Sequence, residues 1–316
     1  VHSMDDAAHL PYTTGMANLV VVYPDAQNDM PVALEEALRV ARPLGGRVMV
    51  PAPGEAGGDA AAVQAWFARG GQEAERLDCG PSAWYACARG AVPGAGEWTQ
   101  LYADPGHTAC SRDTVQGPFT IQWFGHPGPR PMIDRHHRPM SSLFKDGRLF
   151  ITADNGIITV DAYNGTHLWQ LEVPDSRRIG ALKNAGHQLI TGDALHVLAG
   201  NDCWVVEAAT GKRRTMLSAP RVLDGPQEWG YLNICGGLLL GTAQHEGASF
   251  SEHSVLTCSL LEGDFRPVVA SRALFAVDRG TGKPVWRRTA GAYMNTAMAL
   301  ADARLCFIES RGPKAM

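Results

Sequence analysis

One pattern of apolar and polar positions occurs three times in this chain, at residues 157–165, 203–211 and 274–282. Each copy begins with an apolar run, continues into an acidic residue and ends in Asn-Gly or Thr-Gly. The apolar run predicts a strand, and the glycine supplies the positive φ that a two-residue hairpin turn needs. Because the unit recurs, the sequence predicts a repeat architecture.

A second marker follows each turn glycine at a constant distance. Four residues after the glycine come Trp169, Thr215 and Trp286. A large aromatic side chain at this point of the next strand is expected to wedge between neighbouring sheets. The middle copy has threonine there, so the sequence predicts that one such wedge is missing.

The spacing of the turn glycines predicts the size of the repeating unit. Gly165 and Gly211 lie 46 residues apart, close to the ~40–50 residues of a four-stranded propeller blade. Gly211 and Gly282 lie 71 residues apart, so we expect an insertion near residues 245–271, where apolar and polar residues do not alternate cleanly. A β-sandwich with coincidental turns is the alternative, but two markers in one register favour the repeat.

The pattern acid-x-x-[Asn/Thr]-Gly-x-x-x-Trp resembles the repeat of quinoprotein-like (PQQ-like) β-propellers, which the propellers of outer-membrane assembly lipoproteins also use. The resemblance covers about residues 97–316. It implies the fold, with three to four blades, far more specifically than any activity. Asp161, Glu207 and Asp278 are interpreted as turn acids that accept backbone N–H groups.

The first hundred residues follow a different pattern. The all-apolar run at 19–22 predicts a strand covered on both faces. Predicted helices and strands then alternate along the chain. Met30-Pro31 opens the first helix and Pro43–Gly46 ends it, a second helix is expected at 60–68, and strands are expected at 47–50, 73–77 and 82–88. This alternation predicts an α/β layer.

This front segment resembles the C-terminal half of a class I S-adenosylmethionine-dependent methyltransferase. Residues 6–12 are similar to that family's acid-Ala-x-x-Leu-Pro-[Phe/Tyr] segment, and residues 36–47 are similar to its helix and Gly-Gly turn. The resemblance implies that Asp6 and Ala7 face the adenine of the cofactor. The family's glycine-rich first loop has no counterpart here, so S-adenosylmethionine is expected only in a full-length protein, not in this chain alone.

Together these patterns predict a mixed fold, with a partial α/β Rossmann-like domain at 1–92, a junction at 93–115 and all-β propeller blades at 116–316. The junction resembles that of methyltransferase-like/PQQ-like fusions of planctomycete-type bacteria. That resemblance implies a periplasmic or extracellular location, with a cytoplasmic one as the alternative, and favours a degenerate first domain. The chain is interpreted as an internal fragment of a longer protein; a complete protein with few blades is the alternative.

Composition narrows the range of partners. The net charge is −4 and charged residues make up 19% of the chain, so nucleic-acid binding, which requires a basic patch, is not expected. No apolar run approaches the ~18 residues of a transmembrane helix. The seven cysteines contain no Cys-x-x-Cys and no zinc spacing. Cys203 and Cys306 lie in strand patterns and are expected to be buried.

The richest polar cluster of the sequence is Asp134-Arg135-His136-His137-Arg138, which is flanked by prolines. Prolines hold a loop extended and disfavour a helix, so this loop is expected near a propeller face. Its two arginines suit an anionic ligand. A solvated structural loop is the favoured interpretation, with anion or polysaccharide contact and a metal site as the alternatives, and no third metal ligand is marked.

The cofactor markers of quinoproteins are incomplete in this sequence. That family holds pyrroloquinoline quinone with an adjacent Cys-Cys ring, a calcium-binding acid and Asn, and a catalytic Asp. No adjacent cysteines occur here, so the quinone is not expected in this chain. Trp229, Tyr231 and Tyr293 are expected in the core, with ligand contact as the alternative.

The predicted function is therefore a binding or scaffold module without chemistry of its own, which presents propeller loops to a protein, a polysaccharide or a small anionic ligand. Two enzymatic alternatives are kept. One is a methyltransferase whose donor-site front half lies outside this chain, and the other is a quinone-dependent oxidoreductase.

Overall fold

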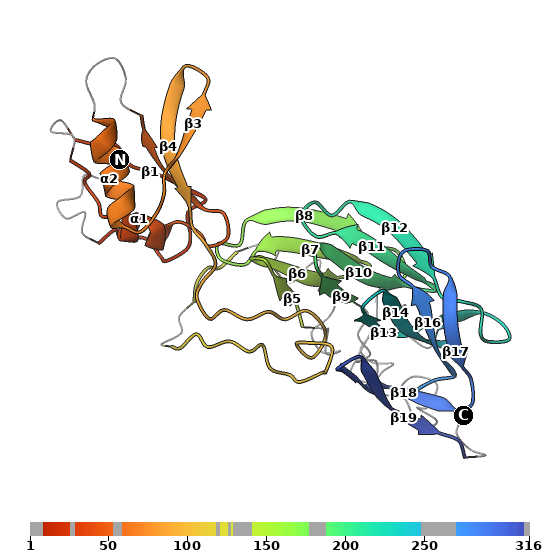
Figure 1. The fold of residues 1–316 in the computed structure, drawn as a ribbon. Coiled ribbons are helices and arrows are strands. Elements are labelled where there is room, and N and C mark those ends of the chain that lie inside the picture. Colours follow the sequence, from red (N-terminus) through yellow and green to blue (C-terminus); the bar gives the residue numbers. More distant parts are fainter. Residues whose placement is uncertain are drawn as a thin grey trace. The chain divides into compact units, whose positions relative to one another are not determined.

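The computed structural model describes residues 9–25, 29–52, 59–117, 121–125, 128, 141–176, 188–247 and 270–312. The chain divides into two compact units (Figure 1). The first comprises Val1–Ala95, Thr114–Phe124 and Asp161–Thr166, and the second comprises Gly96–Asp113, Gly125–Val160 and His167–Met316.

Within its described residues, the first unit contains two helices and a four-stranded sheet with the strand order β1-β2-β4-β3. The elements are β1 (Leu19–Val21), α1 (Leu34–Val40), β2 (Arg47–Pro51), α2 (Ala60–Arg69), β3 (Glu75–Cys79) and β4 (Ser82–Ala88). β1 and β2 are parallel, while β4 is antiparallel to both β2 and β3. The parallel pair requires a crossover, which contains α1.

The helices cover one face of this sheet. Val48 and Val50 of β2 share a buried cluster with Leu34 and Phe67 of the two helices. The opposite face is exposed at β1. The prediction of a strand covered on both faces is therefore wrong at residues 19–22: Leu19 is 51% and Val21 is 39% exposed.

The second unit is built from four successive sheets, here named the first to the fourth. The first contains β5 (Leu143–Lys145), β6 (Arg148–Ala153), β7 (Gly156–Asp161) and β8 (His167–Glu172). The second contains β9 (Gln188–Thr191), β10 (Ala194–Ala199), β11 (Asp202–Glu207) and β12 (Arg213–Ser218). The third contains β13 (Gln227–Cys235), β14 (Leu238–His245), β16 (Ala273–Asp278) and β17 (Pro284–Arg288), and the fourth contains β15 (Ala270–Ser271), β18 (Ala292–Ala301) and β19 (Arg304–Ser310).

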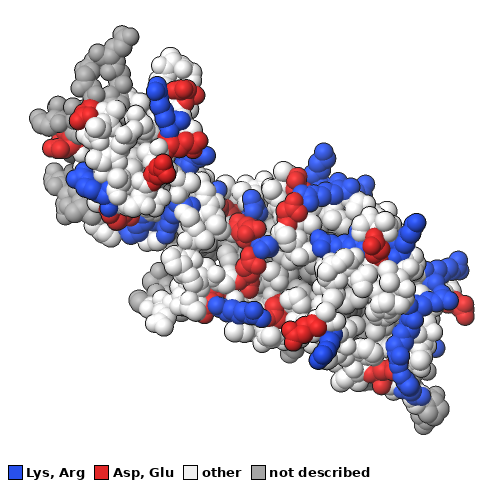
Figure 2. All heavy atoms as spheres, in the orientation of Figure 1, with Lys and Arg blue, Asp and Glu red and all other residues white. Residues whose placement is uncertain are grey.

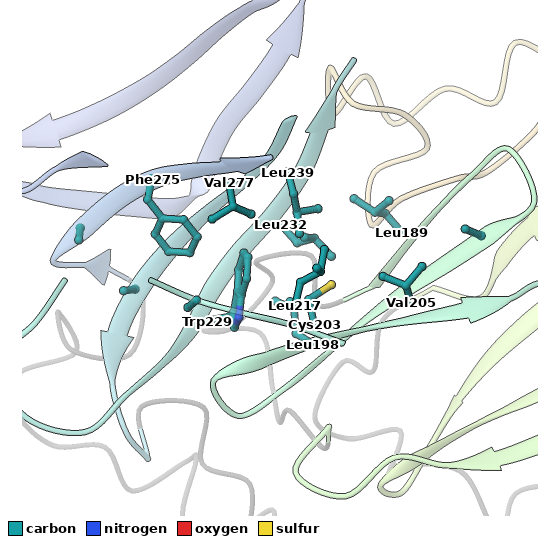
Figure 3. Packing of buried hydrophobic residues seen from close by; sticks show 14 residues of the cluster. Leu189, Leu198, Cys203, Val205, Leu217, Trp229, Leu232, Leu239, Phe275 and Val277 are labelled. Carbon is teal, nitrogen blue, oxygen red and sulfur yellow. The ribbon is translucent and has the colours of Figure 1, made fainter. Parts of the chain in front are cut away.

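Neighbouring sheets stack face to face through shared apolar clusters. The first and second sheets share a cluster that includes Phe150 and Val206. The second and third share the cluster of Figure 3, in which Leu198 and Cys203 lie near Trp229. Up-and-down sheets that stack in chain order form a propeller-like fold, so the predicted all-β part is confirmed at this level.

The three repeated glycines occupy equivalent corners of the first three sheets. Gly165, Gly211 and Gly282 have φ angles of 71°, 74° and 70°. Each glycine N–H donates to the carbonyl of the acid four residues earlier, at 2.9, 2.9 and 2.7 Å. The loop between acid and glycine is longer than the predicted two-residue hairpin, and a register shift precedes it in each sheet. The equivalence of the corners is confirmed.

Two of these corners are covered by tryptophan. The ring of Trp169 lies against Gly211, where a Cβ would meet it at 2.7 Å. The ring of Trp123 lies against Gly165 in the same way. Each indole Nε1 donates to the carbonyl of the residue after the corner acid, at 3.1 and 2.9 Å respectively. The glycine thus serves both for its backbone conformation and for the close approach of an aromatic ring.

The third corner has a different cover. Leu217, not a tryptophan, lies against Gly282, with its Cδ2 atom 3.3 Å from the position of an added Cβ. Thr215, which stands where the other copies have tryptophan, is exposed. The predicted absence of one wedge is confirmed, and the leucine two residues later takes its place.

Candidate functional site

The site residues predicted from the sequence lie outside the described residues. They are Asp6 and Ala7 in the front segment and Asp134, Arg135, His136, His137 and Arg138 in the proline-flanked loop. Their roles therefore stay predictions.

The turn acids are described, and two of them act as expected. Asp278 Oδ1 accepts the N–H groups of Gly280 and Thr281 at 3.1 and 2.7 Å. The hydroxyl of Thr281, which donates to the same oxygen at 2.7 Å, and then these N–H groups lower the pKa of Asp278. Asp161 Oδ1 accepts the two equivalent N–H groups at 2.9 and 3.3 Å. Glu207 differs, because its longer side chain accepts the hydroxyl of Thr210 instead, at 2.5 Å.

A surface depression lies beside the connection between the second and third sheets. Its volume is about 420 Å³, and it is lined by Asn201, Ala219, Arg221, Gly225, Pro226 and Gln227. Asn201 belongs to the turn between β10 and β11, and the other residues belong to or adjoin the connection from β12 to β13. The depression is therefore formed by propeller loops.

Gln227 holds these loops in place. Its Oε1 accepts the backbone N–H groups of Val222 and Leu223 at 3.1 and 3.2 Å. Its Nε2 donates to Asn201 Oδ1 at 3.1 Å and to the carbonyl of Pro220 at 2.9 Å. One side chain thus ties the connection to the neighbouring turn, so the shape of the depression is formed before any ligand binds.

Arg221 supplies the positive charge of the depression. Its side chain is exposed, and it makes no ion pair with any carboxylate of the described residues. A guanidinium offers five donors in a planar arrangement, which matches carboxylate, sulfate or phosphate oxygens. Next to hydrogen-bonded amide groups, this arrangement can bind an anion.

Two other arginines of the same unit, Arg214 and Arg288, are neutralised by carboxylates. Figure 2 shows basic side chains over the region of β12 and β17. Arg214 binds Asp193 and Glu207 at 2.7 and 2.9 Å. Arg288 binds Glu309 at 2.8 Å and lowers the pKa of that carboxyl to about 2. Because of these ion pairs, Arg214 and Arg288 have less positive charge available for a ligand than Arg221 has.

A buried polar chain joins the third and fourth sheets. The hydroxyls of Thr242 and Ser271 donate to Asn295 Oδ1, each at 2.7 Å. Asn295 Nδ2 donates to Gln244 Oε1 at 3.1 Å, and Gln244 Nε2 donates to Glu228 Oε1 at 2.8 Å. The five side chains satisfy one another, as buried polar groups must, and so fix how these sheets meet.

A second polar cluster surrounds the segment Gly96–Asp113. Gln100 Nε2 donates to Asn233 Oδ1 at 3.1 Å, and Asn233 Nδ2 donates to the hydroxyl of Tyr231 at 2.6 Å. Burial raises the pKa of Tyr231 to about 12. The ring of His107 packs edge-on against Tyr231, with 5.9 Å between the centroids. Burial lowers the pKa of His107.

The backbone of this segment is unusual. Ala103, His107, Ala109 and Arg112 all have positive φ, between 55° and 72°. Backbone hydrogen bonds to the sheets hold this segment. In one of them, the N–H of Leu300 in β18 donates to the carbonyl of Pro105 at 2.8 Å. Residues that sequence reasoning interpreted as a junction therefore contribute a hydrogen-bonded cluster to the second unit, and no motif marked them as such.

The remaining sequence expectations concern the core. Trp229, Tyr231 and Tyr293 are fully buried, so the core interpretation is confirmed. Cys203 is buried, and burial raises the pKa of its thiol. Cys306 is exposed, and the prediction for it is wrong because it lies on β19, the edge strand of the fourth sheet.

Comparisons with known proteins assign no family to this chain. No protein-family model and no curated protein matches the chain. BamB from Moraxella catarrhalis is 18% identical, covering 52% of this chain and 41% of that one, with a TM-score of 0.33. A quinohemoprotein alcohol dehydrogenase from Pseudomonas putida HK5 is 15% identical over 62% and 27%, with a TM-score of 0.42. A europium-containing methanol dehydrogenase is 18% identical over 54% and 37%, with a TM-score of 0.33.

The chain thus spans less than half the length of these structures, and the propeller-like fold rests on its own sheets and corners. No described helix is long and apolar enough to span a membrane. No group of three or more His, Cys, Asp or Glu side chains that could hold a metal ion occurs in the described ranges.

Proposed function

We propose that this chain is a β-propeller binding module whose loops take up a small anionic ligand at the depression around Arg221. The observation that carries the proposal is a guanidinium without an ion-pair partner among the described residues, beside loops that Gln227 fixes through four hydrogen bonds. Because the lining is organised in advance, binding costs little ordering of the protein. The volume is in the range of small-molecule sites.

Isothermal titration of the 316-residue protein with glucuronate, and with glucose as the neutral probe, tests this proposal. We expect heat of binding with glucuronate and none with glucose. Arg221→Ala is expected to weaken glucuronate binding about tenfold or more, since a charge-assisted bidentate contact is lost. Arg304→Ala, which removes an exposed arginine of β19, is the matched control and is expected to bind as the wild type does. Equal affinity in Arg221→Ala would refute the proposal.

The proline-flanked loop remains a second place for an anionic ligand. Its two arginines, Arg135 and Arg138, supply the same chemistry as Arg221. A doubly substituted variant, Arg135→Ala with Arg138→Ala, separates the two sites in the same titration. A polysaccharide or a protein that presents carboxylates on its surface is the larger partner that such loops would suit.

The enzymatic alternatives rest on different residues. The parallel pair β1 and β2 with its crossover helix supports an α/β layer, and the methyltransferase-like proposal rests on the segments around Asp6 and residues 36–47. For the quinone, a buried acid and an asparagine are present in Glu228 and Asn295, linked through Gln244, while adjacent cysteines are absent from the sequence. The Asn295 and Glu228 oxygens already accept hydrogen bonds within the buried polar chain, and the cysteine ring of the quinone site has no counterpart.

Calorimetry distinguishes the methyltransferase hypothesis from the oxidoreductase hypothesis. S-adenosylmethionine is titrated alone, and pyrroloquinoline quinone is titrated with calcium. Heat with the first would favour a methyltransferase, and heat with the second would favour an oxidoreductase. A periplasmic or extracellular location belongs to the same fusion-protein proposal and is tested by fractionation of the native host.

A further inference from the structure

The hydrogen bonds of Gln227 determine which way a neighbouring side-chain amide points. Backbone N–H groups only donate, so the atom of Gln227 that faces Val222 and Leu223 is its oxygen, at 3.1 and 3.2 Å. Its nitrogen faces the carbonyl of Pro220, which only accepts, at 2.9 Å. The same nitrogen donates to Asn201 at 3.1 Å, so the Asn201 atom at this contact is Oδ1. The amide nitrogen of Asn201 is therefore the end that does not face Gln227.

Asn201 is held in place by its backbone as well. Its carbonyl accepts the N–H of Ala219 and the indole N–H of Trp229 at 2.9 and 2.8 Å. Asn201 lines the depression beside Arg221, and its Nδ2 has no acceptor among the described residues. Because backbone and side-chain oxygen are both fixed, the two N–H groups of this amide are left at a defined place for a ligand.

The other lining residues limit the chemistry of that ligand. Among the described residues that line the depression, Arg221 alone carries a charge. Gln227 uses its oxygen and both of its N–H groups within the protein, so it has no donor left. Ala219 and Pro226 contribute apolar side chains. One guanidinium, one amide donor and apolar carbon atoms match a carboxylate that is carried on a carbon skeleton.

We propose that Asn201 is the second anion-binding residue of this depression, and that Asn201 and Arg221 together bind the carboxylate of an organic acid of the uronic-acid type. The guanidinium and the amide donate to the two carboxylate oxygens, and the carbon skeleton lies against Ala219 and Pro226. This role of Asn201 rests on the proposed function, because it concerns the same site, and it adds a residue and a ligand class to it.

Asn201→Asp tests the donor without breaking the loop. The variant keeps the oxygen that accepts Gln227 Nε2 but replaces the donor with a negatively charged oxygen. In isothermal titration of the 316-residue protein, we expect glucuronate to bind at least about tenfold more weakly, because a donor is lost and a like charge is added. Thermal unfolding is expected to stay close to that of the wild type, since the hydrogen bond to Gln227 is kept.

Asn18→Asp is the matched control. Asn18 Oδ1 likewise accepts a side-chain amide N–H, from Asn164 at 3.0 Å, so this variant also keeps an acceptor. It adds the same negative charge to the protein, but Asn18 does not line the depression. We expect Asn18→Asp to bind glucuronate as the wild type does.

Two measurements on the wild type separate ligand contact from a structural role. The side-chain amide resonances of Asn201, assigned through its backbone, are expected to shift in NMR spectra when glucuronate is added. This measurement decides even if Asn201→Asp does not fold. Inorganic sulfate offers no carbon skeleton to Ala219 and Pro226 and is expected to bind at least about tenfold more weakly than glucuronate.

The outcomes distinguish the role of Asn201 from the proposed function. Unchanged affinity for glucuronate in Arg221→Ala would refute both together. A loss in Arg221→Ala with wild-type affinity in Asn201→Asp, or with unshifted Asn201 amide resonances, would overturn the role of Asn201 and leave the site at Arg221 standing. An equal loss in Asn18→Asp would attribute the effect to net charge, and equal binding of sulfate would overturn the ligand class.

Discussion

The joint between the first and second sheets and the joint between the second and third bury the same kind of corner with different side chains. In the first, Trp169 covers Gly211 and its indole donates to a carbonyl of the neighbouring sheet at 3.1 Å. In the second, Leu217 covers Gly282 and offers no hydrogen bond. This second joint has its tryptophan on the inner strand, where Trp229 donates to the Asn201 carbonyl at 2.8 Å.

The comparison separates what the repeat requires from what it leaves free. Both joints keep the glycine, because its positive φ closes the corner and its missing side chain makes room for a cover. Neither the identity of the cover nor its place on the neighbouring sheet is fixed. In the second joint the outer strand has no tryptophan at this place. Instead, the ring of Trp229 lies on the inner strand β13, with its centroid 4.8 Å from that of Phe275.

The largest effect is expected from the inner tryptophan of the second joint. Trp229→Ala is predicted to lower the free energy of unfolding by about 4 kcal/mol, since it deletes a fully buried ring and leaves a cavity. Thr215→Ala, at the exposed outer place of the same joint, is the control and should change stability by less than about 0.5 kcal/mol. Denaturant unfolding measures both. Similar losses in the two variants would mean that the outer place still carries the joint.

Acid is expected to act on the second joint through His196. This side chain is fully buried in β10, and neither ring nitrogen has a hydrogen-bond partner among the described residues. Burial, and then the charge of Arg279, lower its pKa from 6.5 to about 4. The unfolded chain therefore binds the proton first, and stability falls as pH decreases from about 6.5 to about 4, by roughly 1.4 kcal/mol per pH unit.

His196→Leu tests this contribution. The variant removes the titration and fills the same fully buried position with an apolar side chain, so the slope of stability against pH between about 6.5 and 4 should become flatter. Chemical denaturation at a series of pH values measures the slope. Because carboxylates such as Glu309 titrate at lower pH, an unchanged slope in this window would show that another group is responsible.

The smallest effect sharpens the role of the indole hydrogen bond in the first joint. Trp169→Phe keeps an aromatic ring near Gly211 but removes the donor to the Ala208 carbonyl, so a loss of about 1 kcal/mol is expected. Leu217→Met, which removes no hydrogen bond at the second joint, is the control and is expected to lose less. Thermal unfolding at one pH compares the two. A smaller loss of stability for Trp169→Phe than for Leu217→Met would show that packing, and not the indole hydrogen bond, stabilises the first joint.

The strand at residues 19–22 shows what a local sequence pattern can predict and what it cannot. Residues 19–22 are uniformly apolar, which predicted the strand correctly, but burial of its two faces depends on which layers pack there. In this strand the face that packs against the helices is partly buried, whereas Leu19 and Val21 are exposed. The prediction that Cys306 is buried was wrong for the same reason, because the apolar pattern of an edge strand does not differ from that of an inner strand.

The sequence by itself determined the corners of this protein. The acid, the glycine and the hydrogen bond between them lie within five residues, so local chemistry suffices to set them. Only the tertiary structure decided which side chain covers each corner, that Gln100 meets Asn233 across 133 residues, and that Arg221 stands beside loops tied by Gln227. Those contacts depend on how whole sheets stack, and stacking is set by the summed fit of many side chains distant in sequence, which no short pattern contains.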